Sequence, residues 1–140
     1  MDRITAIIVV SLSCLFFVGC TRVVGTDSAT ITYRRTGGIV NLDDQLRLYA
    51  DGRAELSRKG AETTFMLDPD QVAQLTSTLD QIPFSSLRSA PTTTSQGADY
   101  IQYELRYQQH TVRMVDTQLP DALLPVLEEL DGIILHQGQP

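Results

Sequence analysis

Apolar and polar residues alternate in four short segments of the first half of the chain, and this alternation predicts four β-strands. The segments cover residues 29–36, 45–50, 53–58 and 62–67. Successive side chains of a strand point to opposite faces, so alternation is typical of a strand with one buried face. Asp51-Gly52 separates the second and third segments, and Asp-Gly between two alternating runs favours a hairpin. The expected core positions in these two segments are Leu46, Leu48, Ala50, Ala54 and Leu56.

A different spacing, with apolar residues three and four positions apart, predicts a helix over residues 68–82. Asp68 is a good N-cap, Pro69 suits the first helical position, and Gln71 lies three residues after the cap, as in a capping box. The expected buried face comprises Val72, Leu75, Leu79 and Ile82. Pro83 is expected to end the helix, because proline cannot donate the next backbone hydrogen bond.

The second half of the chain predicts a loop, a strand pair and a second helix. Residues 88–99 are rich in Ser, Thr, Pro and Gly, which is typical of a loop. Strict alternation predicts a strand over residues 100–108, paired with a strand over residues 111–116. Helical spacing returns over residues 120–135, with an apolar stripe of Leu123, Leu124, Leu127, Leu130 and Ile134. Pro125 is tolerated only near a first turn, so the helix is expected to begin at about Asp121.

The order of these elements predicts an α+β fold, with a largely antiparallel sheet of about five or six strands and two helices packed on one face. The opposite face would carry polar and charged residues, namely Arg47, Tyr49, Glu55, Gln102, Glu104, Arg106 and Arg113. A face of this kind is either simply solvated or a docking surface, and the sequence leaves both open.

The N-terminal segment resembles a bacterial lipoprotein signal peptide. A short charged start precedes an apolar run that ends in Phe17-Val18-Gly19-Cys20, which is similar to a lipobox. The expected organisation is a signal peptide (1–19), a lipidated tether (20–28), a single domain (29–136) and a tail (137–140). Acyl chains on Cys20 would anchor the protein in the cell membrane or outer membrane, with the domain on the extracytoplasmic or periplasmic side. The alternative is an uncleaved signal anchor.

Cysteine usage and charge exclude several classes of function. The chain has two cysteines, and Cys14 lies within the expected signal peptide. With Cys20 acylated, no thiol nucleophile, thiolate metal site or disulfide is available. The net charge of −6 argues against binding to nucleic acid.

Residues suited to catalysis are sparse. The chain has two histidines, His110 in an expected turn and His136 near the expected tail. It contains no His-Glu-x-x-His, no Walker-type phosphate loop and no Gly-x-Ser-x-Gly. Asp43-Asp44 and Asp68-Pro69-Asp70 are short acidic clusters, and Asp68 already has a role as a helix cap. We therefore expect a protein that is not an enzyme and that needs neither metal nor cofactor.

A series of short motifs gives the chain a family resemblance. The motifs occupy residues 31–38, 67–70, 84–87, 97–105, 111–113 and 119–125. In this order they resemble the emfourin-like family, the protealysin-associated protein inhibitors of thermolysin-type metallopeptidases. The resemblance spans nearly the whole expected domain, and it implies a compact protein without cofactors that acts by protein–protein contact.

The resemblance implies a membrane-tethered inhibitor or binder of an exported thermolysin-type metallopeptidase. The alternative is a structural or adaptor lipoprotein of the bacterial cell envelope. The expected partner-binding residues lie in one turn and in the loop of residues 89–99 with the residue after it, and they are Arg35, Thr36, Gly37, Gly38, Asp99 and Tyr100. The two regions flank strands that could be neighbours, so they are expected to converge at one edge of the sheet. The sequence leaves the oligomeric state open.

Overall fold

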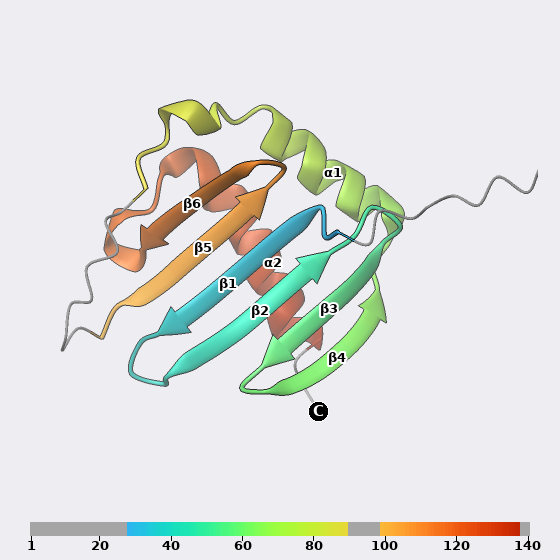
Figure 1. The fold of residues 1–140 in the computed structure, drawn as a ribbon, viewed down its shortest axis with the longest axis horizontal. Coiled ribbons are helices and arrows are strands. Elements are labelled where there is room, and N and C mark those ends of the chain that lie inside the picture. Colours follow the sequence, from blue (N-terminus) through green and yellow to red (C-terminus); the bar gives the residue numbers. More distant parts are fainter. Residues whose placement is uncertain (1–27, 90–98, 138–140) are drawn as a thin grey trace, which may run out of the picture.

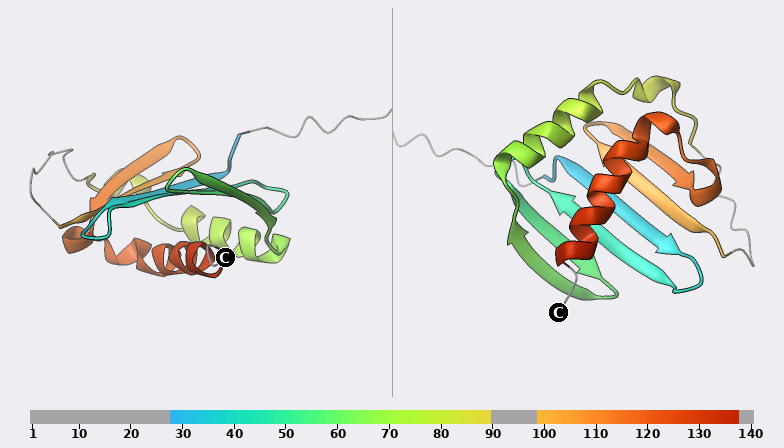
Figure 2. Two further views of the ribbon diagram at one scale, coloured as in Figure 1. Left: turned by 90° about the horizontal axis from the view of Figure 1, so that it is seen from below. Right: turned by 180° about the vertical axis from the view of Figure 1, so that it is seen from behind.

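A computed structural model describes residues 28–89 and 99–137, and within these residues one sheet is covered on one side by two α-helices. Figure 2 shows the sheet as one layer and both helices as a second layer on a single face. The elements are β1 (Ile31–Gly37), β2 (Leu42–Leu48), β3 (Arg53–Arg58), β4 (Ala61–Met66), α1 (Pro69–Asp80), β5 (Ile101–Tyr107), β6 (His110–Val115) and α2 (Leu124–Gln137). The expected signal peptide with Cys20, most of the loop of residues 88–99, and the end of the tail lie outside the described residues.

The six strands are ordered β4-β3-β2-β1-β5-β6, and every neighbouring pair is antiparallel. Hairpins join β1 to β2, β2 to β3, β3 to β4 and β5 to β6, whereas α1 lies between β4 and β5 in the chain (Figure 1). The pairing of β1 with β5 therefore joins a four-stranded meander and a hairpin into one sheet. The predicted α+β class and the antiparallel sheet with helices on one face are confirmed.

The core lies between the sheet and the helices. In β1, β2 and β5 the inward positions follow the predicted alternation: Tyr33 lies opposite Leu46 on one side and Leu105 on the other, and all three side chains are fully buried. Every residue of the core cluster falls between Ile31 and Ile134. A version of the protein that begins at Thr21 therefore retains the whole core.

The first helix begins as predicted. Asp68 is its N-cap, and a side-chain oxygen of Asp68 accepts a hydrogen bond from the backbone N–H of Asp70 at 2.9 Å. Pro69 follows at the first helical position, where its missing N–H costs nothing. The face that packs on the sheet consists of Val72, Leu75 and Leu79.

Two core positions and one helix boundary were predicted wrongly. Ala50 is exposed, because β2 ends at Leu48 and the N–H of Gly52 bonds to the carbonyl of Tyr49 in a turn. Leu124 is also exposed, because α2 begins there rather than at Asp121, after a short 3-10 helix. This later start leaves Pro125 in the first turn of the α-helix, where proline is tolerated.

The helix-free face of the sheet carries the predicted charges, and they pair with one another. Glu55 forms ion pairs with Arg47 and Arg53, at distances of 3.6 and 2.5 Å. On β5, Glu104 likewise forms ion pairs with two arginines, Arg113 at 2.8 Å and Arg106 at 3.6 Å. Exposed pairs of this kind contribute little to stability.

Candidate functional site

The β1–β2 turn and the first residues of β5 meet at one end of the sheet. Gly37 is paired both with Leu42 of β2 and with Ile101 of β5, and the N–H of Gly38 donates to the carbonyl of Tyr100 at 3.0 Å. Tyr100, which directly follows the second of the two expected regions, thus lies beside the turn, at the ends of two central strands rather than at a lateral edge of the sheet. Of the expected loop itself, only Ser89 and Asp99 belong to the described residues. We call residues 37–41 together with Tyr100 the tip.

The backbone of the tip depends on its glycines. Gly37 and Gly38 have φ angles of 90° and 70°, which residues with a side chain rarely adopt. A Cβ atom at Gly37 would lie only 2.7 Å from the carbonyl oxygen of Tyr100. The paired glycines are therefore required for the close approach of β5 to the turn, as well as for the turn itself.

Three apolar side chains project from the tip into solvent. Ile39, Val40 and Tyr100 are 85%, 63% and 47% exposed. Two hydrogen bonds fix the conformation of the turn. The ammonium group of Lys59 donates to the carbonyl of Val40 at 3.2 Å, and the N–H of Asn41 donates to the carbonyl of Gly38 at 3.0 Å. Tyr100 is among the partner-binding residues expected from the sequence, whereas Ile39 and Val40 are not. Two β-branched apolar residues directly after paired glycines nevertheless indicate apolar side chains exposed in a turn.

Substitution of Gly37 by alanine should disturb the tip more than the same substitution at Gly60. Both glycines have positive φ, so each variant loses about 1–2 kcal/mol of stability from backbone strain. Gly60 has open space around its Cβ position, whereas Gly37 does not. We expect Gly37→Ala to lose about 1 kcal/mol or more beyond the loss in Gly60→Ala. Urea unfolding of the two variants measures the difference, and equal losses would contradict the tight packing of Tyr100 on the turn.

Arg35, which the sequence also nominated for partner binding, is turned into the molecule. Its side chain is only 8% exposed and lies on the helix-facing side of β1. The guanidinium group donates to Asp44 of β2 at 2.7 and 3.2 Å and to Asp131 of α2 at 2.9 Å. Arg58 of β3 adds a contact to Asp44 at 3.3 Å. These four residues form an ionic cluster, buried at Arg35 and Asp44 and half-buried at Arg58 and Asp131, that links α2 to three strands beneath the tip. In this arrangement the Arg35 side chain supports the tip from inside the molecule.

Tyr33 completes this cluster. Its hydroxyl donates to Asp131 at 2.8 Å, and its ring stacks on Tyr103 with centroids 6.2 Å apart. Burial, followed by the nearby carboxylate of Asp131, raises the pKa of Tyr33 far above the ordinary value of tyrosine. The hydroxyl therefore stays protonated and remains a donor to Asp131 throughout the neutral range.

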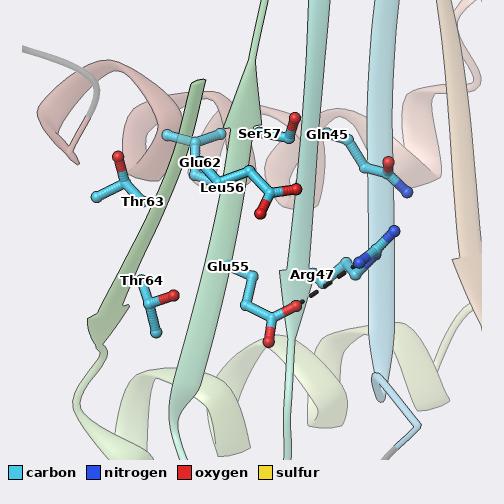
Figure 3. Close-up of a pocket in the computed structure, with 8 residues that line it drawn as sticks. All are labelled: Gln45, Arg47, Glu55, Leu56, Ser57, Glu62, Thr63 and Thr64. Carbon is cyan, nitrogen blue, oxygen red and sulfur yellow. Dashed lines mark ion pairs between the residues drawn. The ribbon is translucent and has the colours of Figure 1, made fainter. Parts of the chain in front are cut away.

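A shallow hollow of about 210 Å³ lies on the helix-free face over β2, β3 and β4 (Figure 3). Its lining is Gln45, Arg47, Glu55, Leu56, Ser57, Glu62, Thr63 and Thr64. In Figure 3 the side chains of Arg47 and Glu55 point toward one another and form the ion pair described above. The lining includes no histidine or cysteine that could act as a base or nucleophile, and its one arginine is paired.

The remaining candidate groups have structural contacts. His110 opens β6 and stacks on Phe84 with centroids 5.4 Å apart. His136 lies in the last turn of α2, with Nδ1 2.7 Å from the carbonyl oxygen of Gly132. Within residues 28–89 and 99–137, no group of three or more His, Cys, Asp or Glu residues could hold a metal ion. None of the helices in that part of the chain is long and apolar enough to cross a membrane.

Taken together, the fold and the tip define a small α+β domain whose exposed apolar residues gather where two central strands end. The family model named Emfourin matches residues 33–131, from the middle of β1 to the middle of α2. The chain belongs to the Emfourin family. Membership supports the general expectation of an inhibitor-like protein that is not catalytic. Comparisons with the curated proteins and with the solved structures found no match.

Proposed function

We propose that the protein inhibits, or binds, an exported thermolysin-type metallopeptidase. The observation that carries this proposal is the family match over residues 33–131, because that match covers the tip and the cluster beneath it. The family resemblance implies action by protein–protein contact, which needs an accessible surface rather than catalytic groups. The tip is the part of the described structure that best meets this need.

The tip has the physical features of an inhibitor contact. Its backbone is fixed by β1–β5 pairing, by the glycine turn and by the ionic cluster, so little conformational freedom is lost on binding. Ile39, Val40 and Tyr100 supply apolar side chains that are already exposed. A few such side chains, inserted into pockets of the partner, contribute most of the affinity of a typical interface. The partner surface is therefore expected to be apolar and concave.

An inhibition assay tests this proposal. The version that begins at Thr21 is titrated against a thermolysin-type metallopeptidase from the same organism, and peptide hydrolysis is followed. We expect inhibition by the unaltered domain, and Ile39→Glu should weaken it at least about 30-fold, the effect of losing a hot-spot side chain. Leu135→Glu is the matched control, since Leu135 is an exposed apolar residue of α2, outside the tip.

Unchanged hydrolysis at micromolar concentrations of the unaltered domain would contradict inhibition. Inhibition that Ile39→Glu and Leu135→Glu weaken equally would retain the function but contradict the tip as its site. Capture of envelope-assembly proteins without any peptidase would favour the adaptor alternative.

We further propose that Cys20 is acylated and that the domain is tethered to a membrane. The lipobox-like sequence supports this proposal. The fold is compatible with it, because the chain enters β1 at Ile31, and the tip lies at the other end of that strand, about 20 Å away at the usual rise per residue (Figure 1). A tether at this end would hold the tip away from the membrane surface.

Substitution of Cys20 by serine should abolish acylation. We expect the variant to accumulate as an uncleaved or soluble precursor, because serine offers no thiol for the acyl chain. Mass spectrometry of the native protein and fractionation of the variant give the result. An unmodified thiol on native Cys20, or a variant that stays with the membranes after an alkaline wash, would favour the signal anchor instead.

A further inference from the structure

The outer edge of β4 is unusually open. β4 is an edge strand, hydrogen-bonded within the described chain only to β3, and all of its residues except Phe65 are exposed. Its sequence Ala-Glu-Thr-Thr-Phe-Met contains no proline, no lysine and a single charge, Glu62. Figure 1 shows it at the margin of the sheet, and the view from behind in Figure 2 shows the same edge beside the helices rather than beneath them. Natural sheets usually protect edges with bulges, lysines, prolines or covering segments.

The opposite edge is protected in this way. Beside β6, Phe84 stacks on His110, and Ser89 accepts a long hydrogen bond of 3.5 Å from the backbone N–H of Arg113. The segment that follows α1 therefore lies against β6. The two edges differ, and the difference singles out β4 as a strand able to accept a partner.

The charges at the two ends of β4 indicate what that partner is. Lys59, the only lysine of the chain, is exposed just before β4, and Asp68 and Asp70 are exposed just after it. If a second copy of β4 paired antiparallel with the first, the lysine end of each strand would lie beside the acidic end of the other. In the dimer each Lys59 would exchange its contact with the Val40 carbonyl for the Asp68-Pro69-Asp70 segment of the other copy, so the strand is complementary to itself in charge.

We propose that the outer edge of β4 pairs with β4 of a second copy of this chain, in an antiparallel dimer with two-fold symmetry. The two six-stranded sheets would become one continuous sheet, with all helices on the same side. Backbone hydrogen bonds along the edge would supply the affinity, as in β-strand addition. The reciprocal contacts of Lys59 with the acidic segment would fix the antiparallel direction.

The pleat, together with the longest overlap of two six-residue strands, limits the register to two choices. Ala61, Thr63 and Phe65 share the helix-facing side, because they lie opposite Arg58, Leu56 and Ala54 of β3. Residues paired across the axis must come from the same face. The axis therefore passes through Thr63, which places Glu62 opposite Thr64, or through Thr64, which places Glu62 opposite Met66. Neither register brings two like charges face to face.

Cysteine cross-linking in the full chain tests the pairing. Thr63→Cys and Thr64→Cys are each expressed in the native host and oxidised in intact cells. The unaltered chain, in which only Cys14 and Cys20 can react, gives the background, and Gln102→Cys on the exposed face of β5 is the matched control. We expect at least about a tenfold excess of disulfide-linked dimer over both controls at position 63 or 64, because a residue on the axis meets its own copy.

Charge reversal gives an independent second measurement. In sedimentation of the version that begins at Thr21, Lys59→Glu and Asp70→Lys should each weaken self-association at least about tenfold, and the double variant should restore it. Cross-linking no stronger than in the Gln102→Cys control, trapping of a different protein, or a double variant no stronger than the singles would overturn the proposal. None of these results depends on whether the protein inhibits a peptidase.

Discussion

Replacement of Asp44 by alanine should lower the free energy of unfolding by about 3–5 kcal/mol. Asp44 is 1% exposed and receives hydrogen bonds from Arg35 at 2.7 and 3.2 Å and from Arg58 at 3.3 Å. Without Asp44, Arg35 keeps only Asp131 among the carboxylates of the cluster, so part of its positive charge is left uncompensated in a poorly solvated site, and the expected loss reflects that desolvation. Urea unfolding of the version that begins at Thr21 measures the loss.

The preceding residue is the matched control. Asp43 makes a similar contact, at 3.0 Å to Arg34, but both side chains are more than half exposed on the helix-free face. Asp43→Ala should therefore change stability by less than about 0.5 kcal/mol. Losses of similar size in the two variants would contradict the burial of the ionic cluster between the sheet and α2.

The cluster shows how far alternation alone can predict a site. Asp44 occurs in phase with Leu46 and Leu48, and Arg35 occurs in phase with Tyr33, so the period of two places both charges on the core face. What the sequence cannot show is the member that α2 contributes. Asp131 is 96 positions from Arg35 and reaches it only after α2 has packed on the sheet. Without that contact, Arg35 looked like part of a surface turn.

The tip was predicted in part for the same reason. The paired glycines indicate a turn locally, and the alternation after residue 99 indicates a strand, so both components can be found in the sequence. Their contact depends on the pairing of β1 with β5, which joins strands that are far apart in the sequence. The exposure of Ile39 and Val40 follows from the length of the turn, and hydrophobicity alone suggests that such residues are buried.

Helix boundaries were predicted well where a cap is encoded locally and less well elsewhere. Asp68 and Pro69 mark the start of α1, and the helix begins at that point. α2 has no comparable signal, because Pro120 and Pro125 are compatible with several starts. A short 3-10 helix precedes α2 in the sequence, and Leu124 consequently lies outside the buried stripe.

The buried stripe of α2 gives the second large expected effect. Leu127 is one of its core residues, and replacement by alanine should lower the free energy of unfolding by about 2–5 kcal/mol through lost apolar burial and the cavity that remains. Leu135, on the same helix, is 55% exposed, so Leu135→Ala should cost less than about 0.5 kcal/mol. Both substitutions replace leucine by alanine in one helix, so the difference in helix propensity cancels between them. Urea unfolding at equal protein concentration compares the two variants, and a loss below about 0.5 kcal/mol for Leu127→Ala would mean that α2 packs on the sheet through another face.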